Sequence, residues 1–210
     1  MKQITILLSA LFLMNVAYAQ KKEIKLNEPD KNRGTSVMKA LSDRASSRAY
    51  AEKPLSMQDL SDLLWAAYGI NRPDGKRTAP TAVNAQDIIL YACLPEGSYL
   101  YNAKENVLEL VSEGDLRPAL AVQQAFVKSV PVVLVLVSDL TRFRMDVERA
   151  RLWGAMDAGF VSQNINIFCA AVGLATVPRA FMDVAKVKEG LKLTENQVPM
   201  LNNPVGYPKD

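Results

Sequence analysis

Residues 131–137 read Pro-Val-Val-Leu-Val-Leu-Val, and this run indicates how the chain folds. Its apolar residues do not alternate with polar ones, so both faces of the strand it predicts are expected to be buried. A strand buried on both faces needs a cover on each side. The run therefore predicts the central strand of a sheet covered by helices.

Helix and strand patterns are interspersed on both sides of this run. Ser36 is placed to cap a first helix, and Ser56 with Asp59 forms a capping-box variant before a second helix that ends at Gly69. The remaining elements are expected to be strand 87–94, a hairpin of 99–101 with 107–111, helix 116–126, helix 148–172, strand 174–177, helix 184–191 and strand 198–205. This order predicts one domain of the α+β or mixed α/β class.

The first 19 residues have the pattern of a secretory signal peptide. Lys2 precedes an apolar run from Ile4 to Val16, and Ala17-Tyr18-Ala19 puts small residues where a signal peptidase cleaves. The alternatives are a buried helix or a membrane anchor, but the run is shorter than the about 20 apolar residues that span a bilayer. The expected division is a signal peptide at 1–19, an N-terminal arm at 20–35 and a globular domain at 36–210. The mature chain is expected to be exported, periplasmic or extracellular, with no transmembrane segment.

Charge and composition exclude several classes of function. Removing Lys2 from the 25 basic side chains leaves 24 against 22 acidic ones, which argues against a nucleic-acid partner. The absence of histidine excludes Ser-His-Asp and Cys-His nucleophiles and nearly all zinc hydrolase sites. Cys93 and Cys169 lie in apolar runs and are predicted to be core residues, with a disulfide as the alternative.

Two segments combine polar groups suited to a phosphate or a heterocycle. In Arg44-Ala45-Ser46-Ser47-Arg48, two guanidinium groups and the hydroxyls between them can hold a phosphate, or can form a solvated helix end. Residues 80–86, Pro-Thr-Ala-Val-Asn-Ala-Gln, place two amides and a hydroxyl before a strand. Such groups suit the edge of a heterocycle, and they are also ordinary turn chemistry.

Two further segments are weaker signals on their own. In Asp157-Ala-Gly-Phe-Val-Ser-Gln163-Asn164, inside the expected long helix, Gly159 allows close approach of another backbone or a partner helix, and structural packing is the simpler interpretation. Residues 173–181, Gly-Leu-Ala-Thr-Val-Pro-Arg-Ala-Phe, predict a helix stop, a short strand and a loop whose backbone amides can face a cofactor ring.

Taken in order, these four segments and a fifth, Pro204-Val-Gly-Tyr-Pro208, resemble the nitroreductase superfamily. The set is most similar to the branch of SagB/ThcOx-type dehydrogenases, and the resemblance extends over residues 36–208. It implies an α+β sandwich with a central mixed sheet flanked by helices. It also implies an entwined homodimer with two FMN sites at the subunit interface and a small-molecule substrate.

The resemblance assigns roles to the residues of these segments. Arg44, Ser46 and Arg48 match the residues that hold the phosphate and ribityl chain of FMN. The loop that reaches the flavin, of which residues 80–84 are usually supplied by the other subunit, is matched by Pro80, Thr81, Asn84 and Gln86. The loop whose backbone lies by the flavin N5 edge is matched by Pro178, Arg179 and Ala180. No catalytic side chain is implied, because in this family the flavin performs the redox step and the protein supplies orientation and electrostatics.

Several positions depart from the family pattern. Ala45 stands where a basic residue is frequent, Asp87-Ile88 replaces Pro-Trp, Ala175 replaces Gly, and Arg179-Ala180 replaces Glu-Gly. Basic residues near the C-terminus that often reach the phosphate are missing unless Lys209 serves. These departures concern the phosphate site and the flavin environment more than the fold.

The leading functional hypothesis is an FMN-dependent oxidoreductase that passes electrons from a donor to an organic acceptor such as a nitro compound or a quinone. One alternative is a protein that binds flavin or another aromatic ligand without turnover, which the departures favour. Another is a peptide-modifying dehydrogenase of the azoline-oxidising type, which rests on analogy at the level of the fold.

Cleavage after Ala19 is a direct test of the exported state. Protein recovered from an exporting host is expected to begin at Gln20, because the small residues at positions 17 and 19 form the cleavage site. Mass spectrometry of the intact mature protein measures this. A mature chain that still contains residues 1–19 would contradict the prediction.

Overall fold

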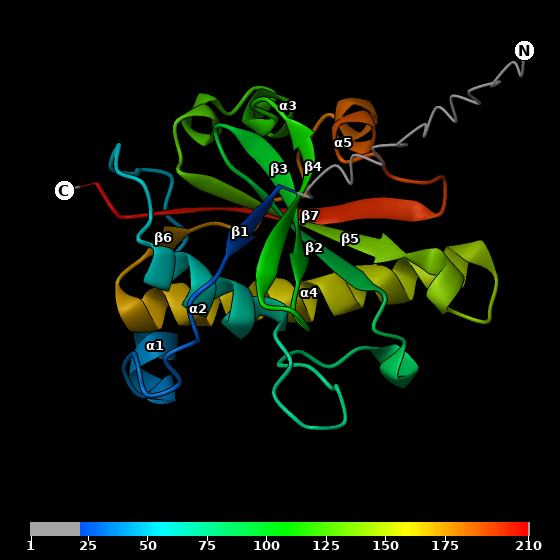
Figure 1. Cartoon of the computed structure of the whole chain (residues 1–210), viewed down its shortest axis with the longest axis horizontal. Helices are drawn as coiled ribbons and strands as arrows, with labels where there is room; N and C mark the ends of the chain where they lie inside the picture. The colour runs from blue at the N-terminus through cyan, green and yellow to red at the C-terminus, as the bar shows by residue number, and fades with distance from the viewer. Residues whose placement is uncertain (1–21, 210) are drawn as a thin grey trace, which may run out of the picture.

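The computed structural model describes residues 22–209 (Figure 1). Its centre is a seven-stranded sheet in the order β1-β4-β3-β2-β5-β7-β6, in which every pair of neighbouring strands among the described residues is antiparallel. The strands are β1 (Glu23–Lys25), β2 (Ile88–Cys93), β3 (Gly97–Asn102), β4 (Val107–Glu113), β5 (Val132–Asp139), β6 (Ala175–Thr176) and β7 (Gln197–Gly206). The predicted signal peptide, 1–19, lies outside the described residues.

Strand β5 is central, as its sequence predicts. It pairs with β2 on one side and β7 on the other, and its residues from Val132 to Ser138 are all buried. Val132, Leu134 and Leu136 belong to one apolar cluster, whereas the alternate residues 133, 135 and 137 belong to a second. Because side chains alternate across a strand, these two clusters are the cores on the two faces of the sheet.

Helices cover both faces, which gives a three-layer sandwich. One face is covered by α2 (Met57–Tyr68) and the long α4 (Val147–Val172), with α1 (Val37–Asp43) packed against α4. The other face is covered by α3 (Arg117–Ala121), the 3-10 turn η2 (Ala125–Lys128) and α5 (Val184–Gly190). Figure 1 shows α3 and α5 above the sheet and α1, α2 and α4 below it. The α+β sandwich with flanking helices is therefore confirmed.

Three details of the expected fold are corrected. The sheet is antiparallel rather than mixed, since each described strand runs opposite to its neighbours. The expected helix 116–126 is broken after Ala121, because Val122 has φ 49° and ψ −105° and the carbonyl groups of Leu120 and Ala121 accept hydrogen bonds from Arg179. The expected extended arm contains β1, which pairs with β4.

The arm is attached to α2 by buried acidic side chains. The backbone N–H groups of Asn27 and Asp30 donate to the hydroxyl of Ser61 and the carboxylate of Asp62, which are consecutive residues of α2. Arg33 forms ion pairs with Asp59 and Asp62, the latter at 2.9 Å. The arm thus covers two carboxylates that would otherwise lack a counter-charge.

Asp59 is held in its charged form by this arrangement. Burial alone would raise the pKa of Asp59, but hydrogen bonds from Ser56, Tyr207 and Arg33 outweigh burial and hold the pKa below its usual value. The same carboxylate therefore joins three segments: the arm, the start of α2 and Tyr207, which directly follows β7.

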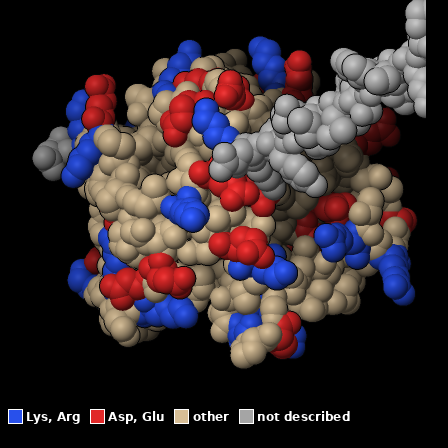
Figure 2. Space-filling model, viewed as in Figure 1, with Lys and Arg blue, Asp and Glu red and all other residues tan. Residues whose placement is uncertain are grey.

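The cysteines confirm the core interpretation. Cys93 and Cys169 are free and buried, and they belong to the clusters on opposite faces of the sheet. The disulfide alternative is therefore wrong. Within residues 22–209, no helix has the length and apolar character needed to cross a membrane. On the face drawn in Figure 2, basic and acidic side chains are interspersed.

Removing Arg33 tests the attachment of the arm. Arg33→Ala leaves Asp59 and Asp62 without their counter-charge and should lower the free energy of unfolding by about 2–3 kcal/mol, below the largest losses for buried pairs because Arg33 is partly exposed. Urea unfolding at neutral pH measures the loss. The exposed Arg149→Ala, as a control, should change stability by no more than about 0.5 kcal/mol.

The pH dependence provides a second readout of the same variant. Because the pKa of folded Asp59 is lowered, its contribution to stability is present above its ordinary pKa of 3.8 and is lost as the pH falls through the lowered value. The difference between wild type and Arg33→Ala should therefore narrow in acid. A difference that stays constant down to the acid transition would contradict this account.

Candidate functional site

The first group of candidate residues lies in the extended segment after α1. The backbone N–H of Ser47 donates to the carbonyl of Thr176 in β6 at 2.9 Å, and Tyr50 pairs with Pro208 in an isolated antiparallel β-bridge. These contacts hold the segment along the edge of the sheet. Arg44, Ser46 and Arg48 are all exposed there.

The side chains of this group are free to bind. Among residues 22–209, neither Arg44 nor Arg48 has an ion pair or a side-chain hydrogen bond, and the Ser46 hydroxyl has no partner. Lysines and arginines elsewhere are commonly paired with acids three or four residues away, as in Lys39 with Asp43. Two unpaired guanidinium groups with a hydroxyl between them offer several donors to an anion.

The second group lies beside the first. Residues 178–180 follow β6 directly, so the hydrogen bond from Ser47 to Thr176 places the two segments next to each other. Pro178 and Ala180 are exposed, whereas Arg179 is buried. The backbone N–H and carbonyl of Arg179 are both paired with Asn202, at 2.8 and 2.7 Å, which leaves the N–H of Ala180 as the amide in this loop without a partner in the described chain.

The side chain of Arg179 points into the protein. Its guanidinium donates to the side chains of Gln124 and Asn202 at 2.6 and 2.7 Å and to the carbonyl of Leu120 at 3.0 Å. All of these partners are neutral. Burial lowers the pKa of Arg179, and the nearby charge of Arg48 lowers it further. The site therefore has a buried positive charge at Arg179 near the exposed Arg48, and neither has an ion pair with an acid in the described residues.

The third group, residues 80–86, forms a strained loop around the 3-10 turn η1 (Ala82–Asn84). Val83, Asn84 and Gln86 have φ values of 49°, 54° and 46°, a left-handed conformation that non-glycine residues rarely adopt. Each such residue costs on the order of 1–3 kcal/mol and persists only where the surroundings fix it. The loop is fixed by a hydrogen bond from the N–H of Gln86 to the hydroxyl of Thr81 at 2.9 Å.

A buried carboxylate on α4 also holds this loop. Asp157 accepts hydrogen bonds from the N–H of Ala82 with both oxygens, at 3.0 and 2.9 Å. The Asp157 motif thus has the structural role that the sequence favours. Asn164 in the same motif donates to the carbonyl groups of Ala66 and Ala67 in α2, so it joins the two helices.

One chain does not bring all three groups together. Residues 44–48 and 178–180 lie by β6, near the C-terminal end of α4, whereas the 80–86 loop lies over Asp157 in the first half of α4. Figure 1 shows α1 and β6 near one end of α4 and η1 toward the other. The placement of residues 80–86 at another chain's site stays a prediction.

Residues 41–207 of this chain match the family model described as the nitroreductase family. This chain belongs to the nitroreductase family. All ten candidate residues lie within the matched range. The membership makes the protein an oxidoreductase by family, and members of this family generally use flavin.

Individual relatives agree with this assignment. The chain is 32% identical over 177 residues to a nitroreductase-type protein of Methanocaldococcus jannaschii, covering 78% of this chain and 86% of the relative. It is 35% identical to a nitroreductase-type protein of Ralstonia eutropha, whose crystal structure has a TM-score of 0.83 with 90% of each chain covered. It is also similar to an FMN reductase [NAD(P)H] of Bacillus subtilis, 23% identical over 83% of this chain and 66% of that protein. The nitroreductase-like fold is thereby confirmed.

An apolar surface on α4 was not anticipated from the sequence. Leu152, Met156 and Phe160 are about half exposed and follow one another at intervals of four residues, so they form a stripe along one side of the helix. Beside the stripe, a cavity of about 270 Å³ is lined by Pro80, Thr81, Ala82, Trp153, Met156, Asp157 and Phe160. The four-residue spacing is visible in the sequence, but a helix that is apolar on most sides does not reveal which side is uncovered.

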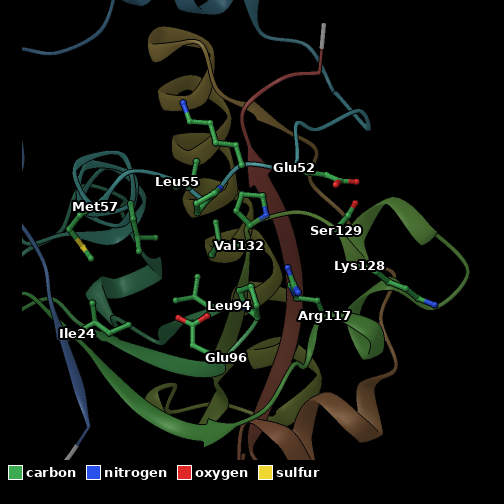
Figure 3. A pocket seen from close by; sticks show the side chains of 15 residues that line it. Ile24, Glu52, Leu55, Met57, Leu94, Glu96, Arg117, Lys128, Ser129 and Val132 are labelled. Atoms are coloured by element: carbon green, nitrogen blue, oxygen red, sulfur yellow. The ribbon is translucent and has the colours of Figure 1, made fainter.

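A larger cavity lies elsewhere in the protein, between the arm, α2 and the loop after η2. It has a volume of about 630 Å³ and is bordered by Leu55, Met57, Leu94 and Val132, and Figure 3 shows Arg117 and Lys128 on one side. None of the ten candidate residues lines it. Arg117 is already bound to Asp115 and to the carbonyl of Val130. Arg44 and Arg48 lie close together by β6 with the Ser46 hydroxyl between them, so we assign the candidate site there despite the greater volume of this cavity.

Proposed function

We propose that this nitroreductase is an exported, FMN-dependent oxidoreductase that acts as a homodimer and passes electrons to a small organic acceptor. The observation that carries the proposal is the group of unpaired donors at Arg44, Ser46 and Arg48, next to the loop that contains Ala180. Beyond family membership, we thus propose FMN as the cofactor, a homodimer as the assembly and a location outside the cytoplasm.

The residues present fit the phosphate end of FMN. A phosphate carries about 1.5 to 2 negative charges at neutral pH and has three acceptor oxygens. Arg44 and Arg48 supply charged donors in planar geometry, and Ser46 supplies a neutral donor. The buried charge of Arg179 adds to the positive potential at this edge without needing to touch the ligand. Arg179 thus places a positive charge near a segment in which Ala45 stands where a basic residue is frequent in the family.

The chain's other groups have orienting roles in this proposal. The unpaired N–H of Ala180 is placed to donate to the edge of the isoalloxazine ring, and Thr81, Asn84 and Gln86 reach the ring from the partner. Bound FMN would supply the two-electron chemistry, taking electrons from a donor and passing them to an acceptor in turn. The donor class implied by export is a reduced quinone, a membrane redox protein or the organic substrate, because NAD(P)H is scarce outside the cytoplasm.

The homodimer is supported by the uncovered stripe on α4. Leu152, Met156 and Phe160 expose apolar surface beside the 80–86 loop, and such patches on a folded protein commonly mark an interface. Gly159 lies next to this stripe, and a Cβ at this position would meet no atom within 4 Å. A helical glycine without a neighbour in its own chain is well placed for close approach of a second helix.

Within the family, we place this protein with the SagB/ThcOx-type dehydrogenases, on the ordered motifs from Arg44 to Pro208. A second candidate function, flavin binding without turnover, is favoured by the replacement of Glu-Gly by Arg179-Ala180 in the loop at the ring. Anaerobic reduction of the flavin-loaded protein separates the two. A flavin that a donor reduces and an organic acceptor reoxidises supports the oxidoreductase, and a flavin that stays oxidised supports the second candidate.

Arg48→Ala tests the phosphate site. One charge-assisted hydrogen bond contributes roughly 1.5–3 kcal/mol, so the substitution should weaken FMN binding by about ten-fold to over a hundred-fold. Riboflavin has no phosphate, so it should bind weakly to wild type and variant alike. Flavin fluorescence titration measures both ligands, with the exposed Arg142→Ala as the control that leaves FMN affinity unchanged. Equal affinity of wild type for FMN and riboflavin would remove the phosphate role from these residues.

Phe160→Glu tests the assembly. A carboxylate in the apolar stripe should oppose association because its charge would be buried at the interface, so the variant should sediment as a monomer where wild type sediments as a dimer. Val184→Glu, at a similarly exposed position on α5, is the matched control and should stay dimeric. Analytical ultracentrifugation measures both. Wild type that sediments only as a monomer at micromolar concentration would refute the dimer.

A further inference from the structure

We propose that Asp87 and Asp157 form a proton-sharing carboxyl pair that positions the 80–86 loop, and that this pair makes cofactor binding sensitive to pH. The inference rests on the proposed function, in which this loop reaches FMN bound to the partner subunit. Asp87 and Asp157 are positioning residues in this account, since they act through the loop and do not touch the cofactor.

Helix α4 contacts the 80–86 loop through the side chain of Asp157. Asp157 is 1% exposed, and its two oxygens accept from the N–H of Ala82. Ala82 comes directly before the left-handed residues Val83 and Asn84. A backbone conformation this unfavourable depends on its anchors. The charge and position of the Asp157 carboxylate therefore determine where the loop sits.

A second carboxyl group, that of Asp87, directly follows the loop in the sequence. Asp87 is fully buried, and its Oδ2 accepts from the hydroxyl of Ser138 at 2.5 Å. Its Oδ1 is buried with no hydrogen-bond partner in the described structure. Ser138, which donates to Asp87, lies against Gly154 of α4, about one helical turn before Asp157, so the two carboxyl groups are neighbours beneath the loop. Two ionised carboxylates can only accept hydrogen bonds. Once Asp87 is protonated, it can donate a hydrogen bond to an oxygen of Asp157.

The surroundings of the pair contain one cation, Arg77, and it forms an ion pair with neither carboxylate in the described structure. Helix α4 contributes Asp157, and β5 contributes the neutral Ser138, which is in close contact with Gly154 of α4. Helix α2 contributes Tyr68, a buried phenol whose hydroxyl also has no partner in the described structure. Arg77 lies over the Tyr68 ring, at 4.6 Å from its centre, and donates to the carbonyl of Tyr68 and the side chain of Gln86. Neither carboxylate has an ion pair among residues 22–209.

This environment favours one shared proton near neutral pH. Burial raises the pKa of Asp87, the hydrogen bond from Ser138 partly opposes this, and the neighbouring Asp157 raises it again, to about 7. Two carboxylates this close cannot both ionise easily. Below this pH, protonated Asp87 donates to Asp157. Above it, two like charges face each other under the loop.

The loop is expected to be held less firmly as the pH rises. Because the pKa of folded Asp87 is raised, its contribution to stability is fully present below its ordinary pKa of 3.8 and is lost as the pH rises from there through about 7. Once Asp87 is ionised, repulsion between the two carboxylates displaces Asp157 and weakens its anchor on Ala82. We therefore expect affinity for FMN to fall as the pH rises from about 6 to about 9, by about ten-fold for each unit by which FMN binding raises the pKa of Asp87.

Matched variants separate this effect from a merely structural one. Asp87→Asn replaces the protonated carboxyl with a neutral donor of the same shape, and Asp157→Asn keeps an acceptor for Ala82 while removing the charge. Both variants should bind FMN with an affinity that does not show the wild-type fall above about pH 7. Asp157→Ala removes the anchor and should weaken FMN binding at every pH. FMN's own phosphate titrates near pH 6, and comparison with Asp87→Asn cancels that contribution.

The experiment is fluorescence titration of FMN with wild type and these variants over this pH range. A wild-type fall in affinity that is absent from Asp87→Asn and Asp157→Asn supports the proposal. The same pH dependence in wild type and both asparagine variants would overturn it. Should one variant fail to fold, as judged by circular dichroism, the other gives the comparison.

A second measurement keeps the pair testable if the proposed function fails. In flavin-free protein, the amide signal of Ala82 in NMR spectra should titrate near neutral pH in wild type and stay constant in Asp87→Asn. Wild type that binds no FMN at any pH would refute the proposed function but not the pair. An Ala82 signal that does not titrate between about pH 6 and about pH 9 would refute the pair, whatever the protein binds.

Discussion

Strand β5 presents apolar side chains on both faces over six consecutive residues, and each face must be removed from water. Burial of one valine or leucine side chain stabilises a fold by roughly 1.5–3 kcal/mol, so six together form the largest single contribution on one strand. The two helical layers exist because this strand needs both. One layer brings α4 against the sheet, and with α4 come Asp157, the apolar stripe and the contact with α1. The other layer brings α3 and η2 to the side chain of Arg179.

The candidate site lies where these layers end. The segment after α1 is held to β6 by one backbone hydrogen bond, and the loop after β6 is held to β7 by the paired backbones of Arg179 and Asn202. Both segments are therefore fixed by the sheet while their charged and amide groups face outward. The 80–86 loop is fixed differently, by a carboxylate on a helix and by local hydrogen bonds. The segments at β6 are thus held rigidly by the sheet, whereas the position of the strained 80–86 loop depends on a few side-chain hydrogen bonds and can change when those bonds change.

Local patterns in the sequence predicted the elements that depend on near neighbours. The cap at Ser56, the hairpin of β3 and β4, the long helix and the buried β5 all follow from spacing within a few residues. Features that depend on distant residues were missed or wrong. The break after Ala121 requires Arg179, which is 58 residues further along the chain. The antiparallel sheet requires knowledge of which strands become neighbours. The pair of Asp87 and Asp157 joins residues that carry no common motif, and the free state of Arg44 and Arg48 is known only once every acid has been placed.

The two edges of the sheet are short: β1 has three residues and β6 has two. An open strand edge offers unpaired backbone groups to which another chain can add, and this is a common route to aggregation. At about 3.3 Å per residue, β1 and β6 are each no longer than about 10 Å, which is too short to hold a foreign strand in register. The longest strand, β7, lies inside the sheet between β5 and β6. Loss of β1 would expose the edge of β4, so the hydrogen bonds and ion pairs that attach the arm to α2 also protect the sheet against the addition of a foreign strand.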